Sequence, residues 1–84
     1  MYLVVEDWHE DYLPDVIVGV FSDIELAWKI AENIMEGMSD RVQVNVLKLE
    51  LNKVYVDCPM EYVGKVERKN YELGQYEIVR VKNA

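Results

Sequence analysis

An acidic and aromatic run near the N-terminus holds the densest group of side chains that could bind a partner or an ion. Five acids lie within ten residues, beside Trp8, His9 and Tyr12. Tryptophan and tyrosine often anchor protein interfaces, and carboxylates around them speed encounter with a basic partner. We therefore predict a protein-binding site formed by Glu6, Asp7, Trp8, Glu10, Asp11, Tyr12 and Asp15. The alternative is that Trp8 packs on the core and the acids are only solvated.

The same run offers oxygen and nitrogen donors, but its spacing is not typical of a metal site. It lacks the alternating Asp/Asn positions, the central glycine and the distal glutamate of an EF-hand loop. One cysteine and one histidine exclude an ordinary Cys/His zinc site. His9 could be a general base and Cys58 a nucleophile, yet the sequence indicates no partner for either. We expect no metal, no cofactor and no catalytic activity.

Two other surfaces have a chemistry of their own. Glu25, Glu32 and Glu36 recur on one predicted helix and could mimic the phosphates of a nucleic acid, although a solvated acidic face explains them more simply. The C-terminal part interleaves tyrosines with lysines and arginines, a pattern that can bind single-stranded nucleic acid. Four glutamates interrupt it, so cross-strand Glu–Lys pairs explain it better and we expect no direct nucleic-acid binding.

The composition describes one small domain with an uneven charge. The chain has 84 residues, a hydrophobic fraction of 51% and a formal charge of −7. Residues 1–40 hold ten acids and one base, a net charge of −9, whereas residues 41–84 have a net charge of +2. An acidic pole of this kind disfavours binding to a phosphate backbone or an anionic membrane. The sequence shows neither a membrane-spanning run nor a signal peptide, so we expect a cytoplasmic protein.

Hydrophobic periodicity predicts the elements that must position these residues. Strands are expected over 1–6, 15–21, 41–51, 62–68 and 76–82, with residues 54–56 extending the third or starting another. The 15–21 strand is apolar on both faces, which favours a central place in the sheet. In the 41–51 strand the apolar phase changes after Val46, which predicts a bulge or bend at Val46–Leu47.

One amphipathic helix is expected after the second strand. Ser22 and Glu25 fit a capping box, and an apolar stripe that includes Trp28 follows at helical spacing. Trp28 is predicted to be buried against the sheet, while Glu25, Lys29, Glu32, Asn33 and Glu36 face away from it. The whole chain, residues 1–84, is then a single α+β domain: a mostly antiparallel sheet in the order β-β-α-β-β-β, with the helix packed on one face.

The first two thirds of the chain resemble small uncharacterised phage and bacterial proteins. The resemblance rests on Tyr2-Leu3-Val4, the acidic loop, Gly19-Val20-Phe21-Ser22 at the helix start, and the strand around Leu49-Glu50-Leu51, and it covers roughly residues 1–56. It implies a β-β-α-β unit and a phage-like setting, hence the host cytoplasm. It implies no catalytic residue.

These observations lead to two hypotheses of different classes. The first is a small acidic, phage-encoded binding protein that inhibits or modulates a basic host protein through its acidic N-terminal half. A nucleic-acid-acting enzyme or a defence complex is the natural target, because its surface is basic. The second is a small oligomeric domain that binds a metabolite or signalling nucleotide between subunits, because 84 residues leave little room for an internal pocket.

Overall fold

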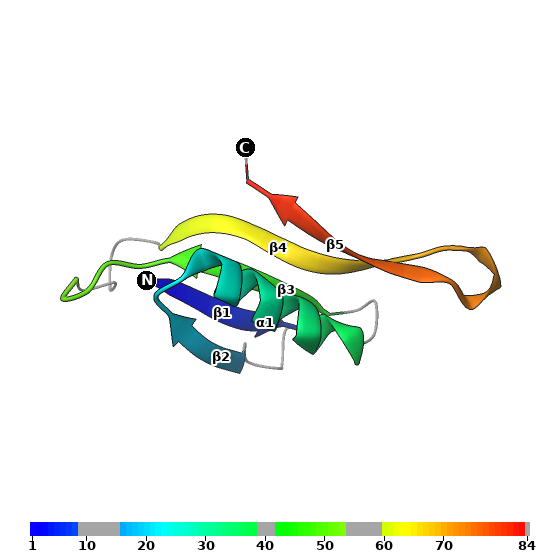
Figure 1. Cartoon of the computed structure of the whole chain (residues 1–84), viewed down its shortest axis with the longest axis horizontal. Coiled ribbons are helices and arrows are strands. Elements are labelled where there is room, and N and C mark those ends of the chain that lie inside the picture. Colours follow the sequence, from blue (N-terminus) through cyan, green and yellow to red (C-terminus); the bar gives the residue numbers. More distant parts are fainter. Residues whose placement is uncertain (9–15, 39–41, 54–59, 84) are drawn as a thin grey trace.

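The predicted α+β fold is confirmed. The computed structural model describes residues 1–8, 16–38, 42–53 and 60–83, in the order β-β-α-β-β-β (Figure 1). Its elements are β1 (Tyr2–Asp7), β2 (Val16–Phe21), α1 (Ile24–Glu36), β3 (Gln43–Lys48), β4 (Glu61–Asn70), a 3-10 turn η1 (Glu72–Gly74) and β5 (Tyr76–Lys82). The third predicted strand is shorter than expected, and the proposed extension at residues 54–56 lies outside the described residues.

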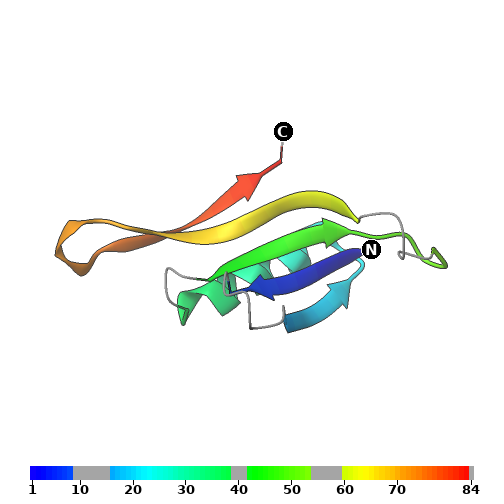
Figure 2. The same cartoon turned by 180° about the vertical axis from the view of Figure 1, so that it is seen from behind.

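The five strands form one antiparallel sheet in the order β2-β1-β3-β4-β5. Helix α1 covers one face, and Figure 2 shows the sheet from the side opposite the helix. The prediction that residues 15–21 form a central strand is wrong, because β2 lies at the edge and pairs with β1 alone among the described strands. Apolar residues on both faces of a strand therefore do not determine how many neighbouring strands it has.

Helix α1 is positioned by its first turn and by its apolar stripe. The N-cap is Asp23, whose Oδ1 accepts a hydrogen bond of 3.0 Å from the Glu25 backbone N–H, so the predicted Ser22 cap is displaced by one residue. Carboxylate caps satisfy a free N–H and also interact favourably with the helix dipole. The residues turned to the sheet are those expected from the periodicity: Ala27, Trp28, Ala31 and Met35 are buried.

The core lies between α1 and the three middle strands. Val4 of β1, Val44 and Val46 of β3 and Val66 of β4 meet the helix and are completely buried. Trp28 is 1% exposed, which confirms its predicted burial. Side chains alternate along a strand, so Leu3 and Val5 point to the face away from α1, and they are buried there as well.

The predicted irregularity at Val46–Leu47 is present, but its extra residue belongs to the neighbouring strand. The β3–β4 register shifts between Val46 and Leu47, where Val46 pairs with Gly64 and Leu47 pairs with Tyr62. Val63 is therefore the unpaired residue, whereas β3 pairs regularly with β1 from Gln43 to Lys48. The apolar phase also changes because β3 ends at Lys48, which leaves Leu49 and Leu51 outside the strand.

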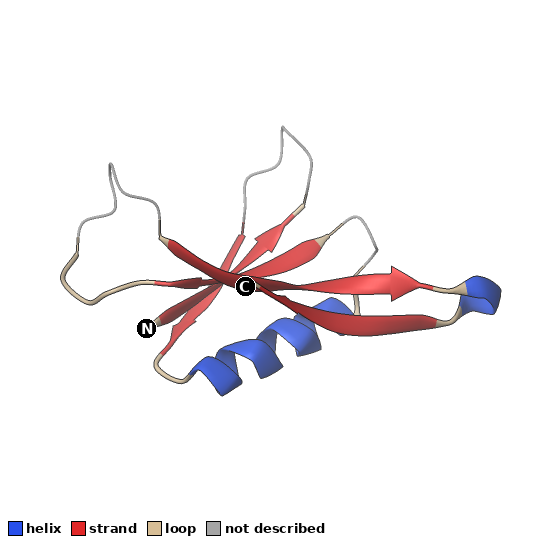
Figure 3. Cartoon of the chain, turned by 90° about the horizontal axis from the view of Figure 1, so that it is seen from above, coloured by secondary structure: helices blue, strands red, loops and turns tan. Residues whose placement is uncertain are grey.

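The last two strands form a hairpin that projects beyond the helix (Figure 3). Strand β4 has ten residues, the longest in the sheet, and its outer part pairs with β5 alone among the described strands. In the turn, Gly74 has a left-handed backbone with φ 75°. Leu73 is also left-handed, with φ 63°, and it is almost completely exposed at the tip.

Candidate protein-binding site

The predicted binding site begins at the end of β1, where the structure holds Trp8 in place. Trp8 is half-buried and packs against the hydrophobic core, and its ring Nε1–H donates a hydrogen bond of 3.2 Å to Oε2 of Glu6. The packing predicted by the alternative interpretation is therefore present in part. The indole is nevertheless partly exposed and fixed in orientation, and a fixed side chain loses little conformational freedom on binding.

Asp7 belongs to a polar network on the face of the sheet opposite the helix. Its Oδ2 accepts a hydrogen bond of 3.3 Å from Nε2 of Gln43, the first residue of β3. Gln43 Oε1 in turn accepts a hydrogen bond of 3.3 Å from Nζ of Lys65 on β4. The network links three adjacent strands and keeps the Asp7 carboxylate beside the end of β1.

The other predicted site residues cannot be placed relative to this end. Glu10, Asp11, Tyr12 and Asp15 lie outside the described residues, as do His9 and Cys58. Of the seven predicted residues, the structure thus places Glu6, Asp7 and Trp8, and these three are consecutive at the end of one strand.

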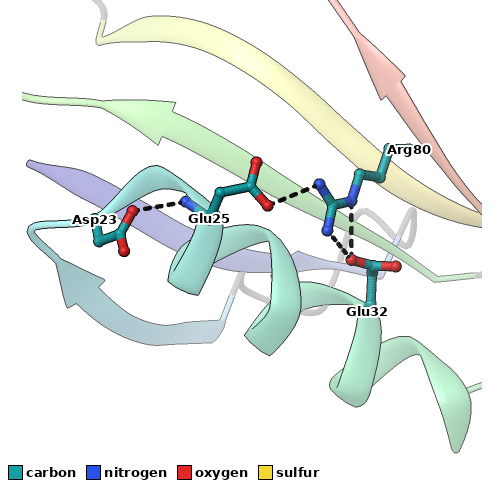
Figure 4. Close-up of polar contacts among 4 residues, drawn as sticks. All are labelled: Asp23, Glu25, Glu32 and Arg80. Carbon is teal, nitrogen blue, oxygen red and sulfur yellow. Dashed lines mark hydrogen bonds and ion pairs between the residues drawn. The ribbon is translucent and has the colours of Figure 1, made fainter.

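The acids of the helix are mostly exposed, as predicted, but Glu25 and Glu32 also contact Arg80 of β5. Arg80 of β5 donates from Nε to Oε1 of Glu32 at 2.8 Å, a second bond runs from Nη2 to the same oxygen, and Nη1 reaches Oε2 of Glu25 at 3.4 Å (Figure 4). The Arg80 guanidinium also lies 5.5 Å from the centre of the Trp28 ring. These contacts raise the pKa of Arg80 further above its ordinary value, chiefly through the Glu32 hydrogen bonds. Arg80 therefore offsets part of the negative charge of Glu25 and Glu32, which weakens the nucleic-acid mimicry hypothesis.

Arg80 was not singled out as a site residue by the sequence, and its role can be measured. We expect Arg80→Gln to lower the free energy of unfolding by about 1 kcal/mol, because partly exposed ion pairs contribute little while charge-assisted hydrogen bonds contribute more. Arg80→Lys should restore only part of this loss, since an ammonium group cannot reproduce the forked geometry. Urea unfolding of the three proteins tests this, and equal stability of Lys and Arg at position 80 would contradict it.

Several tyrosines and basic residues of the C-terminal hairpin contact other residues of the hairpin, in addition to the contacts of Arg80 with the helix. Arg68 stacks over Tyr76 at 3.9 Å from the ring centre, and the Tyr71 hydroxyl donates to Oε2 of Glu77 at 2.8 Å. That hydrogen bond raises the pKa of Tyr71 above its ordinary value. Lys65 pairs with Glu67 at 3.4 Å, but both residues lie on β4, so this ion pair is not one of the predicted cross-strand pairs. These contacts leave no specific indication of a nucleotide site on the hairpin.

Comparison with protein-family models, with curated proteins and with solved structures gives no match for this chain. Within the described ranges, no three His, Cys, Asp or Glu side chains are grouped so that they could hold a metal ion. The described part of the chain also contains no helix with the length and apolar character needed to cross a membrane.

Proposed function

We propose that this protein is a small acidic binding protein that inhibits or modulates a basic partner by docking through the segment Glu6 to Asp15. The observation that carries the proposal is the partly exposed indole of Trp8, which is held by the hydrogen bond to Glu6 and follows Asp7 directly in the sequence. Tryptophan and tyrosine anchors are frequent energetic centres of an interface. The protein acts by binding and without catalysis.

The charge of the chain defines the class of partner. With a net charge of −9 in residues 1–40, the N-terminal half repels nucleic acid and attracts a basic protein surface. Nucleic-acid-acting enzymes and defence complexes carry such surfaces, because they bind phosphates. The resemblance of residues 1–56 to small phage proteins supports a phage origin, with a host protein as the target in the host cytoplasm.

The proposal predicts that the acids of the segment control the association rate and that Trp8 controls the dissociation rate. Replacing Asp7, Glu10 and Asp11 with Asn, Gln and Asn should slow association several-fold at low salt, and raising the salt should slow the wild type in the same way. Trp8→Ala should instead speed dissociation, as loss of a buried anchor does. Because Trp8 also packs on the core, its variant must be checked by thermal melting and compared at a temperature where both proteins are folded.

The experiment begins with affinity capture from nuclease-treated bacterial lysate and continues with binding kinetics against the purified partner. The matched control replaces Glu61, Glu72 and Glu77 with Gln, three exposed acids of the C-terminal half that give the same change in net charge. This control should associate nearly as fast as the wild type. If the control and the Asp7/Glu10/Asp11 variant slow association equally, the effect comes from net charge alone and the proposed site is wrong.

A further inference from the structure

The outer edge of β2 has a composition that does not match its position. All six residues, Val16–Phe21, are apolar or glycine, and no described strand pairs with their outer side. Edge strands are normally protected by charged residues or proline, because free backbone N–H and C=O groups recruit another strand. The opposite edge, β5, follows this rule with Glu77, Arg80 and Lys82. Strand β2 thus has the sequence of an interior strand at the edge of the sheet.

Apolar side chains border this edge on both faces of the sheet. On the face away from α1, Ile17 is 67% exposed and Val20 is 47% exposed. Ile17 pairs with Val5 and Val20 pairs with Leu3, so both point to that face. On the helix face, Val16 is also exposed. The edge therefore combines backbone groups that no described strand pairs with and apolar surface above and below them.

Helix α1 has an apolar side toward the same edge. Glu25 and Glu32 point toward β5, since both contact Arg80. Successive helix residues turn by about 100°, so Ile30 and Ile34 lie about 140° and 180° around the axis from Glu25. Both isoleucines are half-buried and lie on the β2 side of the helix. The described acids of the helix are thus directed away from the β2 edge.

From these observations we infer that β2 pairs antiparallel with β2 of a second copy of this chain, forming a dimer with one continuous sheet. Antiparallel pairing of identical strands places a two-fold axis between them, perpendicular to the sheet, so each copy presents the same surface to the other. Both α1 helices then lie on the same face of the joined sheet, and their apolar sides face one another across the two β2 strands.

A second copy fits this edge better than a basic partner protein does. Strand β2 contains no charge that would attract a basic surface, whereas an identical apolar strand is complementary to it. The extra residue of the β1–β2 bulge, Val18, interrupts the edge, so the new ladder is short and the apolar side chains must supply much of the contact. The dimer surface adjoins the proposed binding segment, since Val16 pairs with Glu6, but the inference does not depend on the proposed function.

Sedimentation equilibrium of the full chain tests the dimer directly. We expect a dimer whose population rises with concentration at about 10–500 µM, and tighter association at high salt, because salt screens the repulsion between two chains of charge −7. This salt dependence is opposite to that expected for the basic partner, so the two proposals can fail independently. Amide exchange of residues 16–21 should slow as concentration rises.

Ile17→Lys combined with Val20→Lys supplies the decisive variant. Both positions are substantially exposed, so the monomer should stay folded, while lysines beside the joined strands should weaken dimerisation at least ten-fold. The control is Val81→Lys on the opposite edge strand, 36% exposed, which should leave the dimer unchanged. The double variant and the control each reduce the net negative charge of the chain. A loss of dimer therefore cannot come from stronger charge repulsion between the two copies. A wild type that is monomeric at every concentration and salt, or a dimer unaffected by the double variant, would overturn the inference.

Discussion

Trp28→Ala is expected to lower the free energy of unfolding by ~3–5 kcal/mol, the cost typical of removing a large aromatic side chain from a core. Trp28 is 1% exposed and lies at the centre of the helix face that meets the sheet. A domain of this length has a total stability of about 4–12 kcal/mol, so this loss is a large share of it. Loss of the indole also removes the aromatic face near the Arg80 guanidinium.

Chemical unfolding followed by circular dichroism measures this loss. Leu26→Ala is the matched control, because Leu26 is in the same helix but 45% exposed, and it should change stability by less than about 1 kcal/mol. Similar midpoints for the Trp28 variant and the wild type would mean that the helix does not pack on the sheet through this residue.

Gly64→Ala should be the second most damaging small change, with a loss of about 3 kcal/mol. A Cβ at this position would lie 2.6 Å from the Val81 carbonyl oxygen, 2.8 Å from Cη2 of Trp28 and 3.0 Å from Cα of Lys82. Two of these atoms belong to the backbone of β5, so the strands would have to separate before a methyl group could fit. Overpacking of a rigid site typically costs ~1–3 kcal/mol, and the backbone contacts place Gly64 at the upper end.

Gly64→Ala should destabilise the protein although glycine is intrinsically unfavourable in a strand. The sign of the change in stability therefore tests the close contacts around Gly64. Glycine in a strand interior is normally unfavourable, and replacing it relieves conformational entropy when space allows. Gly37→Ala is the control, because a Cβ there would meet nothing within 4 Å, and it should be neutral or slightly stabilising. Thermal melting of both variants decides the matter: a Gly64 variant as stable as the Gly37 variant would show that the close approach to Trp28 and β5 is absent.

The Trp28 and Gly64 substitutions should also couple. The Trp28 ring occupies part of the space that the Gly64 Cβ would need, so removing the ring relieves part of the clash. In the double variant we expect a total loss smaller than the sum of the two single losses by about 1 kcal/mol, as is usual for residues in contact. If the two losses were strictly additive, the strain in the Gly64 variant would come entirely from contacts with the β5 backbone and not from the Trp28 ring.

Much of the fold was accessible from the sequence because its signals are local. The helical spacing of apolar residues identified α1 and the burial of Trp28, and alternation identified most strands. Alternation in β1 also assigned Val4 to one face and Leu3 and Val5 to the other. The bulge at Val46–Leu47 was located by a change of phase, although the pattern of one strand could not show that its partner supplies the extra residue.

The candidate site was predictable only in part. Residue types alone nominated Glu6, Asp7 and Trp8, because acids beside an aromatic residue are visible in the sequence. The packing of Trp8 on the core and its bond to Glu6 depend on the elements that surround the end of β1. The compensation of Glu25 and Glu32 by Arg80 joins residues at least 48 positions apart, and no periodicity encodes such a pair.

The sequence by itself determined the class of fold, the buried face of the helix and the excess of acids in residues 1–40. Each of these follows from composition or from repeats within one element. Only the tertiary structure decided that β2 lies at an edge, that Gly64 meets Trp28 and β5, and that the helix acids pair with Arg80. These features depend on strand order and register, which are set by contacts between distant segments, and local preference cannot specify them.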